Sequence, residues 1–319
     1  MSSALSVGAG LMAVTWLVVS QPAAAQSPLM PDARTYQRDI EKWRVEREAS
    51  LRSKDGWLSI SGLFFLKEGR NRFGSDTSND LVLPSTSPAR AGTFELRQGR
   101  VFATLRRGVD ARFRGRPARQ DVSFEMKKAG DLGDGDALAI GPLTLFVHLS
   151  GDKLAIRMRD AESPLLKQFT GLKWFDVDPA YRVTARFIPF DAPRNMNVPN
   201  ILGDVERYVS PGVLAFRLGG QEYRLQPFQV GSPGSNRFFI VFKDLTSGKE
   251  TYGAARFVYA DMPRNGTTII DFNRAYNPPC AFNPFTTCPL PQPSNRLTVR
   301  ITAGERDYGH VDAVATRPG

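Results

Sequence analysis

The strongest constraint on this chain is its regular punctuation by turn residues. Short apolar or alternating segments are separated at even intervals by Gly, Asn, Asp, Ser and Pro. Ser150-Gly151-Asp152 lies between "ALAIGPLTLFVHL" and "KLAIRMRD", and Gly219-Gly220 lies between "VLAFRL" and "EYRLQPF". Glycines at these points can take the positive φ angles of tight hairpins, so each pair of segments predicts two antiparallel strands. Strands this short and evenly spaced predict sandwich or barrel regions, not a parallel sheet.

One segment near the N-terminus breaks this β pattern. Between residues 26 and 56, Tyr36, Ile40 and Trp43 recur at the i, i+4, i+7 spacing of one helix face, and charged residues fill the other positions. Gly56 supplies a stop signal. The predicted fold class is therefore mainly β, with antiparallel sandwich or barrel regions and one N-terminal amphipathic helix.

The 319 residues are enough for one large β domain or two smaller ones. A break in the strand pattern at "DAESPLLKQFTG" favours two regions. The first is a sandwich-like β region over residues 57–160, and the second, over 161–319, carries a segment rich in Cys and Pro. Within the second region the stretches that flank Ser247-Gly248 are expected to pair. "GTTIIDFN" and "RLTVRITAG" are predicted to be the final strands.

Residues 1–25 are predicted to be a signal peptide. They contain no Asp, Glu, Lys or Arg, and their apolar stretch "LMAVTWLVV" is too short to span a bilayer. Ala23-Ala24-Ala25 supplies the small residues of a cleavage site. We therefore expect a mature chain from about Gln26, exported to the periplasm or secreted, with no membrane span after cleavage.

Export bears on the two cysteines, Cys280 and Cys288, because an oxidising compartment favours disulfides. Their short separation predicts a disulfide that closes a small loop. A reactive thiol or part of a metal site is the alternative, but His148 and His310 are the only histidines and neither stands at zinc-ligand spacing from the cysteines. We therefore expect a disulfide, no metal site and no cofactor.

The formal net charge of +10 is carried partly by residues 97–119, which hold eight arginines. Such a stretch could meet phosphate, anionic lipid or acidic polysaccharide, although a solvated β face is the favoured explanation. We expect no nucleic-acid partner, because the chain is predicted to be exported and has no recognisable nucleic-acid-binding module. The sequence does not indicate an oligomeric state.

Known catalytic motifs are absent or misplaced. No G-x-S-x-G elbow occurs, and Ser150-Gly151-Asp152-Lys153, which matches S-x-x-K by letter, falls on a predicted hairpin turn instead of a helix start. His148, within "LFVHLS", is predicted to be a strand residue with a satisfied hydrogen bond rather than a catalytic base. A functional site must therefore come from another part of the chain.

The segment Asp271–Leu297, "DFNRAYNPPCAFNPFTTCPLPQPSNRL", concentrates polar side chains and conformational constraint. It continues the predicted strand "GTTIIDFN", whose side chains alternate between two faces. Both faces begin apolar and end polar, so the strand is expected to leave the core and reach a rim. Pro278-Pro279 cannot donate ladder hydrogen bonds and must end it. Prolines and the expected disulfide would then fix the loop that follows.

Two explanations account for these polar residues. In the structural one, Asp271, Asn273 and Asn277 cap turns and satisfy backbone groups around an irregular loop. In the functional one, a rigid site binds a small polar or anionic ligand, and its side chains recognise carboxylate, phosphate or hydroxyl groups of that ligand. The residues of that site would be Asp271, Asn273, Arg274, Tyr276, Asn277, Asn295 and Arg296.

A hydrolase-like enzyme is the alternative function. Asp271 and Glu305 would act as an acid–base pair, and Arg274 or Arg296 would stabilise developing negative charge. Glycoside hydrolysis belongs to this class, and it requires two carboxylates about 5–9.5 Å apart.

Several of these stretches resemble a known bacterial family, the domain of unknown function 1684 (DUF1684). They begin with "WRVERE" and "DGWLSISGLFFLKEGRNRFGSDTSNDLVLP", continue through "GLKWFDVDPAYRVTARFIPF", "SPGVLAF" and "DLTSGKETYGAARFVYADMP", and end in "DFNRAYNPPCAFNPFTTCPLPQPSNRLTVRITAGE". The resemblance covers most of the chain after the signal segment. It implies no activity and no catalytic residue, because the family has none established. It does favour a functional role for the C-terminal segment.

A weaker resemblance concerns "FGSDTSNDLVLPSTSPARAGTFELRQGRV", which is similar in rhythm to forkhead-associated domains, β-sandwiches that bind phosphothreonine. Ser75 follows Gly74 where those domains have an Arg, and Gly92 falls near the position of their His. The resemblance therefore implies a sandwich-like fold for the N-terminal half and no phosphopeptide-binding residues.

Overall fold

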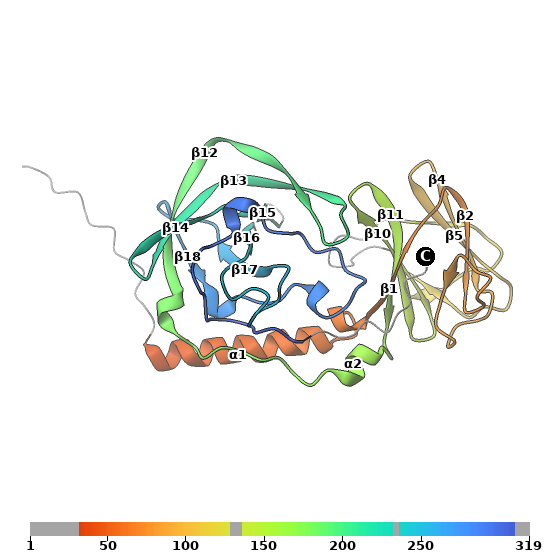
Figure 1. Cartoon of the computed structure of the whole chain (residues 1–319). Coiled ribbons are helices and arrows are strands. Elements are labelled where there is room, and N and C mark those ends of the chain that lie inside the picture. The colour runs from red at the N-terminus through yellow and green to blue at the C-terminus, as the bar shows by residue number, and fades with distance from the viewer. Residues whose placement is uncertain (1–31, 128–135, 232–235, 310–319) are drawn as a thin grey trace, which may run out of the picture.

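The computed structural model describes residues 32–127, 136–231 and 236–309. The predicted signal peptide and His310 lie outside these ranges. Two β units stand side by side, and one long helix runs along the second unit (Figure 1). The predicted fold class is confirmed, because the described chain is mainly β, its sheets are almost entirely antiparallel, and the long helix is N-terminal. No helix in the described ranges is both long and apolar enough to cross a membrane.

Helix α1 spans Ala33–Arg52, within the predicted residues 26–56. It begins where the Asp32 side chain accepts a hydrogen bond from the Thr35 backbone N–H at 3.1 Å. Tyr36 and Ile40 are buried, as their helical spacing predicted. The remaining helical segments are short: η1 (Trp57–Ser59), α2 (Pro164–Gln168), η2 (Pro179–Tyr181), η3 (Phe272–Arg274), η4 (Pro279–Ala281) and η5 (Pro293–Asn295).

The first β unit packs two sheets face to face. One sheet has the strand order β1-β11-β10-β9-β6-β7, and the other has the order β3-β2-β4-β5-β8. Their strands are β1 (Ile60–Phe65), β2 (Gly69–Gly74), β3 (Leu81–Val82), β4 (Gly92–Arg97), β5 (Arg100–Leu105), β6 (Arg112–Phe113), β7 (Arg116–Pro117), β8 (Phe124–Met126), β9 (Ala137–Ile140), β10 (Leu143–Ser150) and β11 (Lys153–Asp160). Phe73 and Phe94 from one sheet share a buried core with Leu145 and Ile156 from the other.

The second β unit is one strongly curved sheet with the order β17-β16-β15-β13-β12-β18, in which β14 also pairs with β13. Its strands are β12 (Arg182–Pro199), β13 (Val205–Leu218), β14 (Gln221–Leu225), β15 (Phe228–Val230), β16 (Arg237–Phe242), β17 (Arg256–Asp261) and β18 (Thr267–Asp271). The end strands β17 and β18 lie next to each other and are joined by a turn with an Arg264–Thr267 bridge. The sheet therefore nearly closes into a barrel.

The hairpin predictions are confirmed where turn chemistry was strongest. Gly151 has a φ of 59° between β10 and β11, and Gly219 and Gly220 have φ of 58° and 82° between β13 and β14. The segments on either side of Ser247-Gly248 pair as β16 and β17. Turn residues with positive φ therefore predicted the strand pairs that adjoin them.

The predicted final strand "RLTVRITAG" is wrong, because this segment is not a strand in the structure. Side chains take the place of a ladder along it. The fully buried Arg256 donates to the carbonyls of Ile301, at 2.9 Å, and of Ala303, and the Asp244 carboxylate accepts from the Ile301 N–H at 2.7 Å. The alternating pattern indicated a segment with buried side chains, which this one has. Buried side chains, and not a neighbouring strand, pair with the N–H of Ile301 and with the C=O groups of Ile301 and Ala303.

The expected disulfide is also wrong in this structure, where Cys280 and Cys288 are both free thiols. The Cys288 sulfur accepts a hydrogen bond from the Cys280 backbone N–H at 3.1 Å, and burial raises the pKa of the Cys288 thiol well above its ordinary value. The hydrogen bond from Cys288 lowers the pKa of the Cys280 thiol, so the two side chains interact without a covalent bond. The loop is held instead by hydrogen bonds such as Asn283 Nδ2 to the Trp57 carbonyl at 2.9 Å.

Polar contacts join the two β units. At the end of the β10–β11 hairpin, Ser150 Oγ donates to Asp204 Oδ2 at 2.7 Å.

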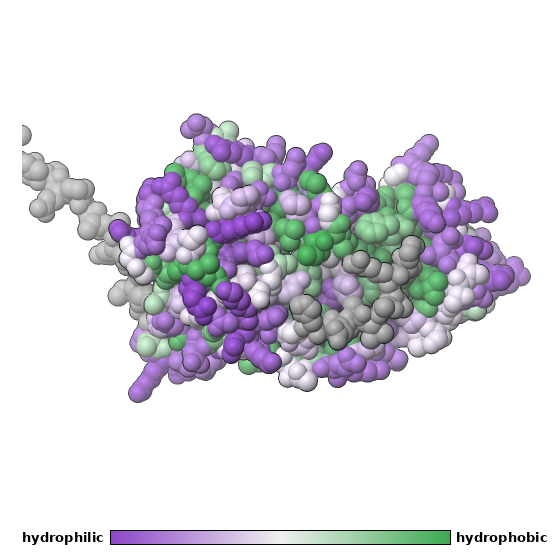
Figure 2. All heavy atoms as spheres, in the orientation of Figure 1, coloured by the Kyte–Doolittle hydropathy of each residue, from purple (hydrophilic) through white to green (hydrophobic). Residues whose placement is uncertain are grey.

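His148 is buried in β10, and its Nε2 accepts from Arg157 Nη2 at 2.8 Å, which confirms it as a satisfied strand residue. In the face drawn in Figure 2, hydrophilic side chains cover the outer strands and hydrophobic ones gather mainly near the junction of the units.

Candidate functional site

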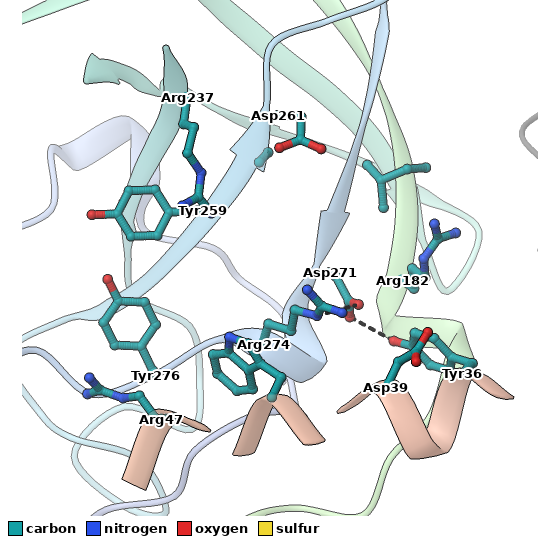
Figure 3. Close-up of a pocket in the computed structure, with 13 residues that line it drawn as sticks. Tyr36, Asp39, Arg47, Arg182, Arg237, Tyr259, Asp261, Asp271, Arg274 and Tyr276 are labelled. Atoms are coloured by element: carbon teal, nitrogen blue, oxygen red, sulfur yellow. Dashed lines mark hydrogen bonds and ion pairs between the residues drawn. The ribbon is translucent and has the colours of Figure 1, made fainter. Parts of the chain in front are cut away.

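An open cavity of about 450 Å³ lies between α1 and one end of the barrel-like sheet (Figure 3). Its volume is within the range typical of small-molecule sites. Charged and aromatic side chains from the helix and from strands β12, β16, β17 and β18 meet there. The lining residues are Tyr36, Asp39, Trp43, Arg47, Arg182, Arg237, Tyr259, Ala260, Asp261, Ile269, Asp271, Arg274 and Tyr276.

One wall of the cavity is a stripe along α1. Tyr36, Trp43 and Arg47 follow one another at the spacing i, i+7, i+11, so their side chains project from one face of the helix. Arg47 Nη2 donates to the Asn277 carbonyl at 3.0 Å, which fixes the helix against the segment after β18. The wall is therefore anchored to the barrel-like sheet by hydrogen bonds as well as by packing.

Two cross-strand pairs place opposite charges on the other walls. Arg182 of β12 stands opposite Asp271 of β18, and Arg237 of β16 stands opposite Asp261 of β17. Directly opposed residues of antiparallel strands carry their side chains on the same face of the sheet. The sheet therefore presents one Arg–Asp pair on each side of the β17–β18 closure.

Asp271 is held in place by three contacts. Its Oδ1 accepts from the Tyr36 hydroxyl at 2.8 Å and from the Asn273 backbone N–H at 3.1 Å, and its Oδ2 lies 3.8 Å from Arg274 Nε (Figure 3). Burial, and next the nearby Asp271 charge, raise the pKa of Tyr36 above its ordinary value, so its hydroxyl stays a donor. Asp271 is both a cavity residue and the cap of η3.

This cap ends the strand earlier than the sequence suggested. β18 stops at Asp271, and the turn of η3 begins at Phe272, well before Pro278-Pro279. The period-two alternation therefore fails after Asp271, and Arg274, three residues on, comes back to the cavity side with Asp271. A 3-10 turn brings residues three apart onto one face, which explains the difference.

Asn273 is structural. It is fully buried, its Nδ2 donates to the Tyr36 hydroxyl at 2.9 Å and to the Asp178 carbonyl at 2.8 Å, and its Oδ1 accepts from the Asp178 N–H at 3.0 Å. It is not available to a ligand, because it is fully buried and these contacts use both of its N–H groups. It positions the Tyr36 hydroxyl that holds Asp271.

Two tyrosines form an aromatic wall with arginines over them. The Arg237 guanidinium lies 4.5 Å from the ring centroid of Tyr259, and the Arg47 guanidinium lies 4.6 Å from that of Tyr276. The two rings are nearly parallel, at an angle of 19° and a centroid separation of 6.2 Å. Cation–π attraction therefore orients both arginines, and Arg237 keeps its N–H groups at the cavity, whereas those of Arg47 face the Asn277 carbonyl and Glu305.

Glu305 lies beneath this wall and is not among the cavity residues. Its side chain is fully buried, and its Oε2 is 3.5 Å from Arg47 Nε. Within the described chain neither carboxylate oxygen makes a hydrogen bond of normal geometry. Burial raises the pKa of Glu305 to about 7, although the Arg47 charge opposes the shift.

The remaining predicted site residues lie away from the cavity. Asn295 is buried and bonds to the backbone of Gln226 and Val241 at 2.8 to 2.9 Å, and Arg296 is exposed beside Lys243. Asn277 is buried behind the cavity, where its Nδ2 donates to the Arg306 carbonyl at 2.8 Å. Of the seven predicted binding residues, Asp271, Arg274 and Tyr276 line the cavity.

Most of the residues that line the cavity were not predicted from sequence motifs. The residues missed are Tyr36, Asp39, Trp43, Arg47, Arg182, Arg237, Tyr259 and Asp261. The apolar stripe Tyr36–Ile40–Trp43 did carry a signal, because Arg47 continues it at the next helical step and an arginine on a buried stripe needs a partner. The strand residues carried none, because their proximity depends on sheet order.

The charges of the cavity nearly balance. Four arginines and three aspartates line it, and Glu305 lies directly behind Arg47. In the described ranges no three His, Cys, Asp or Glu side chains come together to hold a metal ion. The arrangement can therefore bind and orient a molecule through charge-assisted hydrogen bonds and aromatic contacts.

A second cavity of about 500 Å³ lies on the arginine-rich stretch of the first unit, next to Phe113 and Phe124. Arg114 at its edge is already paired with Asp136 at 2.5 Å. All its lining residues fall within the short stretch 113–124. It lacks the convergence of separate elements that distinguishes the first cavity.

Comparisons with solved structures found three similar proteins of interest. An uncharacterized protein from Haloarcula marismortui is 35% identical, with a TM-score of 0.39, over 45% of this chain and 80% of that one. The FHA domain of FhaA, solved with the intracellular domain of Rv3910, is 15% identical, with a TM-score of 0.20, over 29% of this chain and 82% of that one. The N-terminal FHA domain of Saccharomyces cerevisiae Rad53p is 13% identical, with a TM-score of 0.19, over 32% of this chain and 70% of that one.

A comparison with curated proteins found no match to the chain. The model of the family described as protein of unknown function (DUF1684) matches residues 167–306. The matched range includes every strand of the second β unit and the segment Asp271–Leu297, whereas "WRVERE" and the other motifs of the first 166 residues precede it. Residues 167–306, which hold the second β unit, therefore belong to the DUF1684 family.

Proposed function

We propose that this protein binds a small polar ligand, which can carry negative charge, in the cavity between α1 and the barrel-like sheet. The observation that carries the proposal is the convergence of four arginines and four aromatic side chains on one cavity of about 450 Å³. These residues come from α1, from strands β12, β16 and β17, and from η3 and the residue two positions after it, so the site is built by the fold and not by a single loop. Sites on such rigid elements hold side chains in a fixed geometry.

Arg274 is the cavity residue best placed to reach a ligand. Its side chain is 44% exposed, and its contact with Asp271, at 3.8 Å, is too long for a strong ion pair. The Asp271 carboxylate is itself fixed by Tyr36 and by the Asn273 N–H. A ligand oxygen can therefore take up the Arg274 guanidinium without disturbing the support of Asp271.

The acid–base hydrolase is less well supported. Such chemistry needs both carboxyl groups at the substrate, but the Glu305 side chain has no exposed surface and lies behind Arg47. Asp271 is occupied by three contacts of its own. The geometry favours binding over catalysis by this pair.

A matched pair of arginine variants tests the proposal. The full exported chain is screened against metabolites and small glycans by thermal shift, since a ligand that binds only the folded state raises the melting temperature. We expect Arg274→Met to fold normally and to abolish the shift given by the best ligand. Arg296→Met, an exposed arginine away from the cavity, is the control and should keep it. Loss of the shift in both variants, or in neither, contradicts the proposed site.

We also propose that the protein works outside the cytoplasm, in the periplasm or after secretion. The support is the charge-free, apolar character of residues 1–25 and the alanines that close them. Mass spectrometry of the protein from its native host should give a mature N-terminus near Gln26. An N-terminus at Met1 in the major species would contradict export.

A further inference from the structure

The cavity offers acceptors as well as donors. In the part of the chain that the structure describes, the carboxylates of Asp39 and Asp261 make no hydrogen bond or ion pair, and both residues are exposed at the cavity. The Arg237 guanidinium likewise has only its stacking contact with Tyr259. A ligand in the cavity therefore meets open carboxylate acceptors beside an open guanidinium donor.

This mixture disfavours a compact dianion. Such a ligand would gain from Arg237 and Arg274 but would face three aspartates. Like charges a few ångströms apart near a protein surface repel strongly, because water screens them less there than in bulk. In the described residues the Asp39 and Asp261 carboxylates form no ion pair that would neutralise them, so they would repel such a ligand.

A hydroxyl group suits both kinds of partner, because it donates one hydrogen bond and accepts others. Adjacent hydroxyls on a ring can donate to Asp39 or Asp261 and accept from Arg237 or Arg274. Hydrogen bonds to a charged group are stronger than those between neutral groups. The open donors and acceptors of the cavity are therefore matched by a polyhydroxylated molecule.

The aromatic residues add the other half of such recognition. Trp43 is partly exposed at the cavity and is held by an edge-to-face contact with Trp174, at a centroid distance of 5.5 Å. The ring faces of tryptophan are electron-rich, so they attract the weakly positive C–H groups of a saturated ring. A sugar ring carries C–H groups on its faces and hydroxyls around its edge.

We infer that the ligand of this cavity is a carbohydrate, with hydroxyls that donate to Asp39 and Asp261 and accept from Arg237 and Arg274, and a ring face that packs on Trp43. One carboxylate on the sugar is compatible with the four arginines. This inference depends on the proposed function, since it names the class of molecule that the same cavity binds.

The direction in which one substitution changes the binding affinity separates the ligand classes. Asp261→Asn removes negative charge and keeps the shape of the side chain. Binding of a sugar should weaken by about tenfold, because a charged acceptor contributes roughly 1.4 kcal/mol or more. Binding of an anion that is not a sugar should instead strengthen, because a repulsive charge has gone. Asp191→Asn, an exposed aspartate outside the cavity, is the control.

Calorimetric titration of the full mature chain would use five probes: a neutral disaccharide, a hexuronic acid, inorganic phosphate, succinate and the zwitterion glutamate. We expect one of the two sugars to bind, to weaken in Asp261→Asn and Trp43→Leu, and to be unaffected in Asp191→Asn. Tightest binding of phosphate, succinate or glutamate, lost in Arg274→Met, would overturn the carbohydrate inference and leave the proposed function standing. Binding of any probe that Arg274→Met does not change would overturn both.

Discussion

At the scale of single residues, two carboxyl groups expected to act together are held in different environments. Asp271 sits at the edge of the cavity with hydrogen bonds from Tyr36 and the Asn273 N–H. Glu305 is fully buried, with Arg47 at 3.5 Å as its partner. Burial removes the water that would stabilise the charged carboxylate, which is why the pKa of Glu305 rises to about 7 although the Arg47 charge opposes the shift.

This raised pKa predicts how stability depends on pH. The folded pKa of about 7 exceeds the ordinary value of 4.5, so the folded state binds the Glu305 proton more tightly than the unfolded chain does. The contribution of this proton to the free energy of unfolding is therefore full below about pH 4.5 and falls as pH rises to about pH 7, by up to about 1.4 kcal/mol per pH unit. In Glu305→Gln the fall should be absent.

Urea denaturation across that pH range measures the effect as the stability of the wild type minus that of the variant. Glu46→Gln, on the exposed side of α1, is the control and should keep the wild-type slope. Equal slopes for the wild type and Glu305→Gln would show that Glu305 does not hold a proton in the folded state.

At the scale of elements, the C-terminal segment packs on the barrel-like sheet without becoming a strand of it. Arg256 of β17 is fully buried and donates to the carbonyls of Ile301 and Ala303, and its charge is balanced by Asp244 at 3.3 Å. Asp244 also accepts from the Ile301 N–H. One buried ion pair therefore supplies hydrogen bonds to the backbone of this segment that a neighbouring strand would otherwise give.

Arg256→Met should consequently cost about 3–5 kcal/mol in the free energy of unfolding, because it leaves Asp244 as an unpaired buried charge and the two carbonyls without donors. Arg224→Met, which breaks the exposed pair with Glu222 at 3.1 Å, should cost less than about 1 kcal/mol. Chemical denaturation of both variants checks the difference. If the two losses are similar, the buried pair does not hold the segment.

At the scale of the whole molecule, the two β units are joined by a polar contact at the tip of the β10–β11 hairpin. Asp204, between β12 and β13, accepts from Ser150 Oγ at 2.7 Å and from Lys153 Nζ at 2.8 Å. The hydrogen bond from Lys153, and next that from Ser150, lower the pKa of Asp204 below its ordinary value. The contact ties a hairpin of the first unit to a hairpin of the second.

Asp204→Ala should therefore destabilise the protein by about 1–3 kcal/mol near neutral pH. Because the folded pKa is lowered, this stabilisation is present above the ordinary pKa of 3.8 and is lost as pH falls through the folded value, so the variant and the wild type should converge in acid. Thermal unfolding at neutral and acidic pH measures the gap. Asp152→Ala, an exposed residue of the same hairpin, is the control, and an equal effect there would contradict the contact.

Much of the fold could be predicted because turn chemistry acts locally. Gly151 and the pair Gly219-Gly220 take positive φ at the turns that their flanking segments predicted. The C-terminal strand and the disulfide failed for a different reason. Burial of Arg256 and of the Cys288 thiol depends on neighbours far away in sequence, and no local pattern reports such neighbours.

The sequence by itself determined the mainly β class, the N-terminal helix and the concentration of polar side chains in the segment after β18. These features depend on periodicity and on residues close together in the chain. Only the tertiary structure decided the site. Arg47, Arg182 and Arg237 come from three separate elements, and they meet Asp271 and Arg274 only where the curved sheet nearly closes against α1. Sheet curvature and helix docking are set by the whole core, so the cavity exists only once the core has packed.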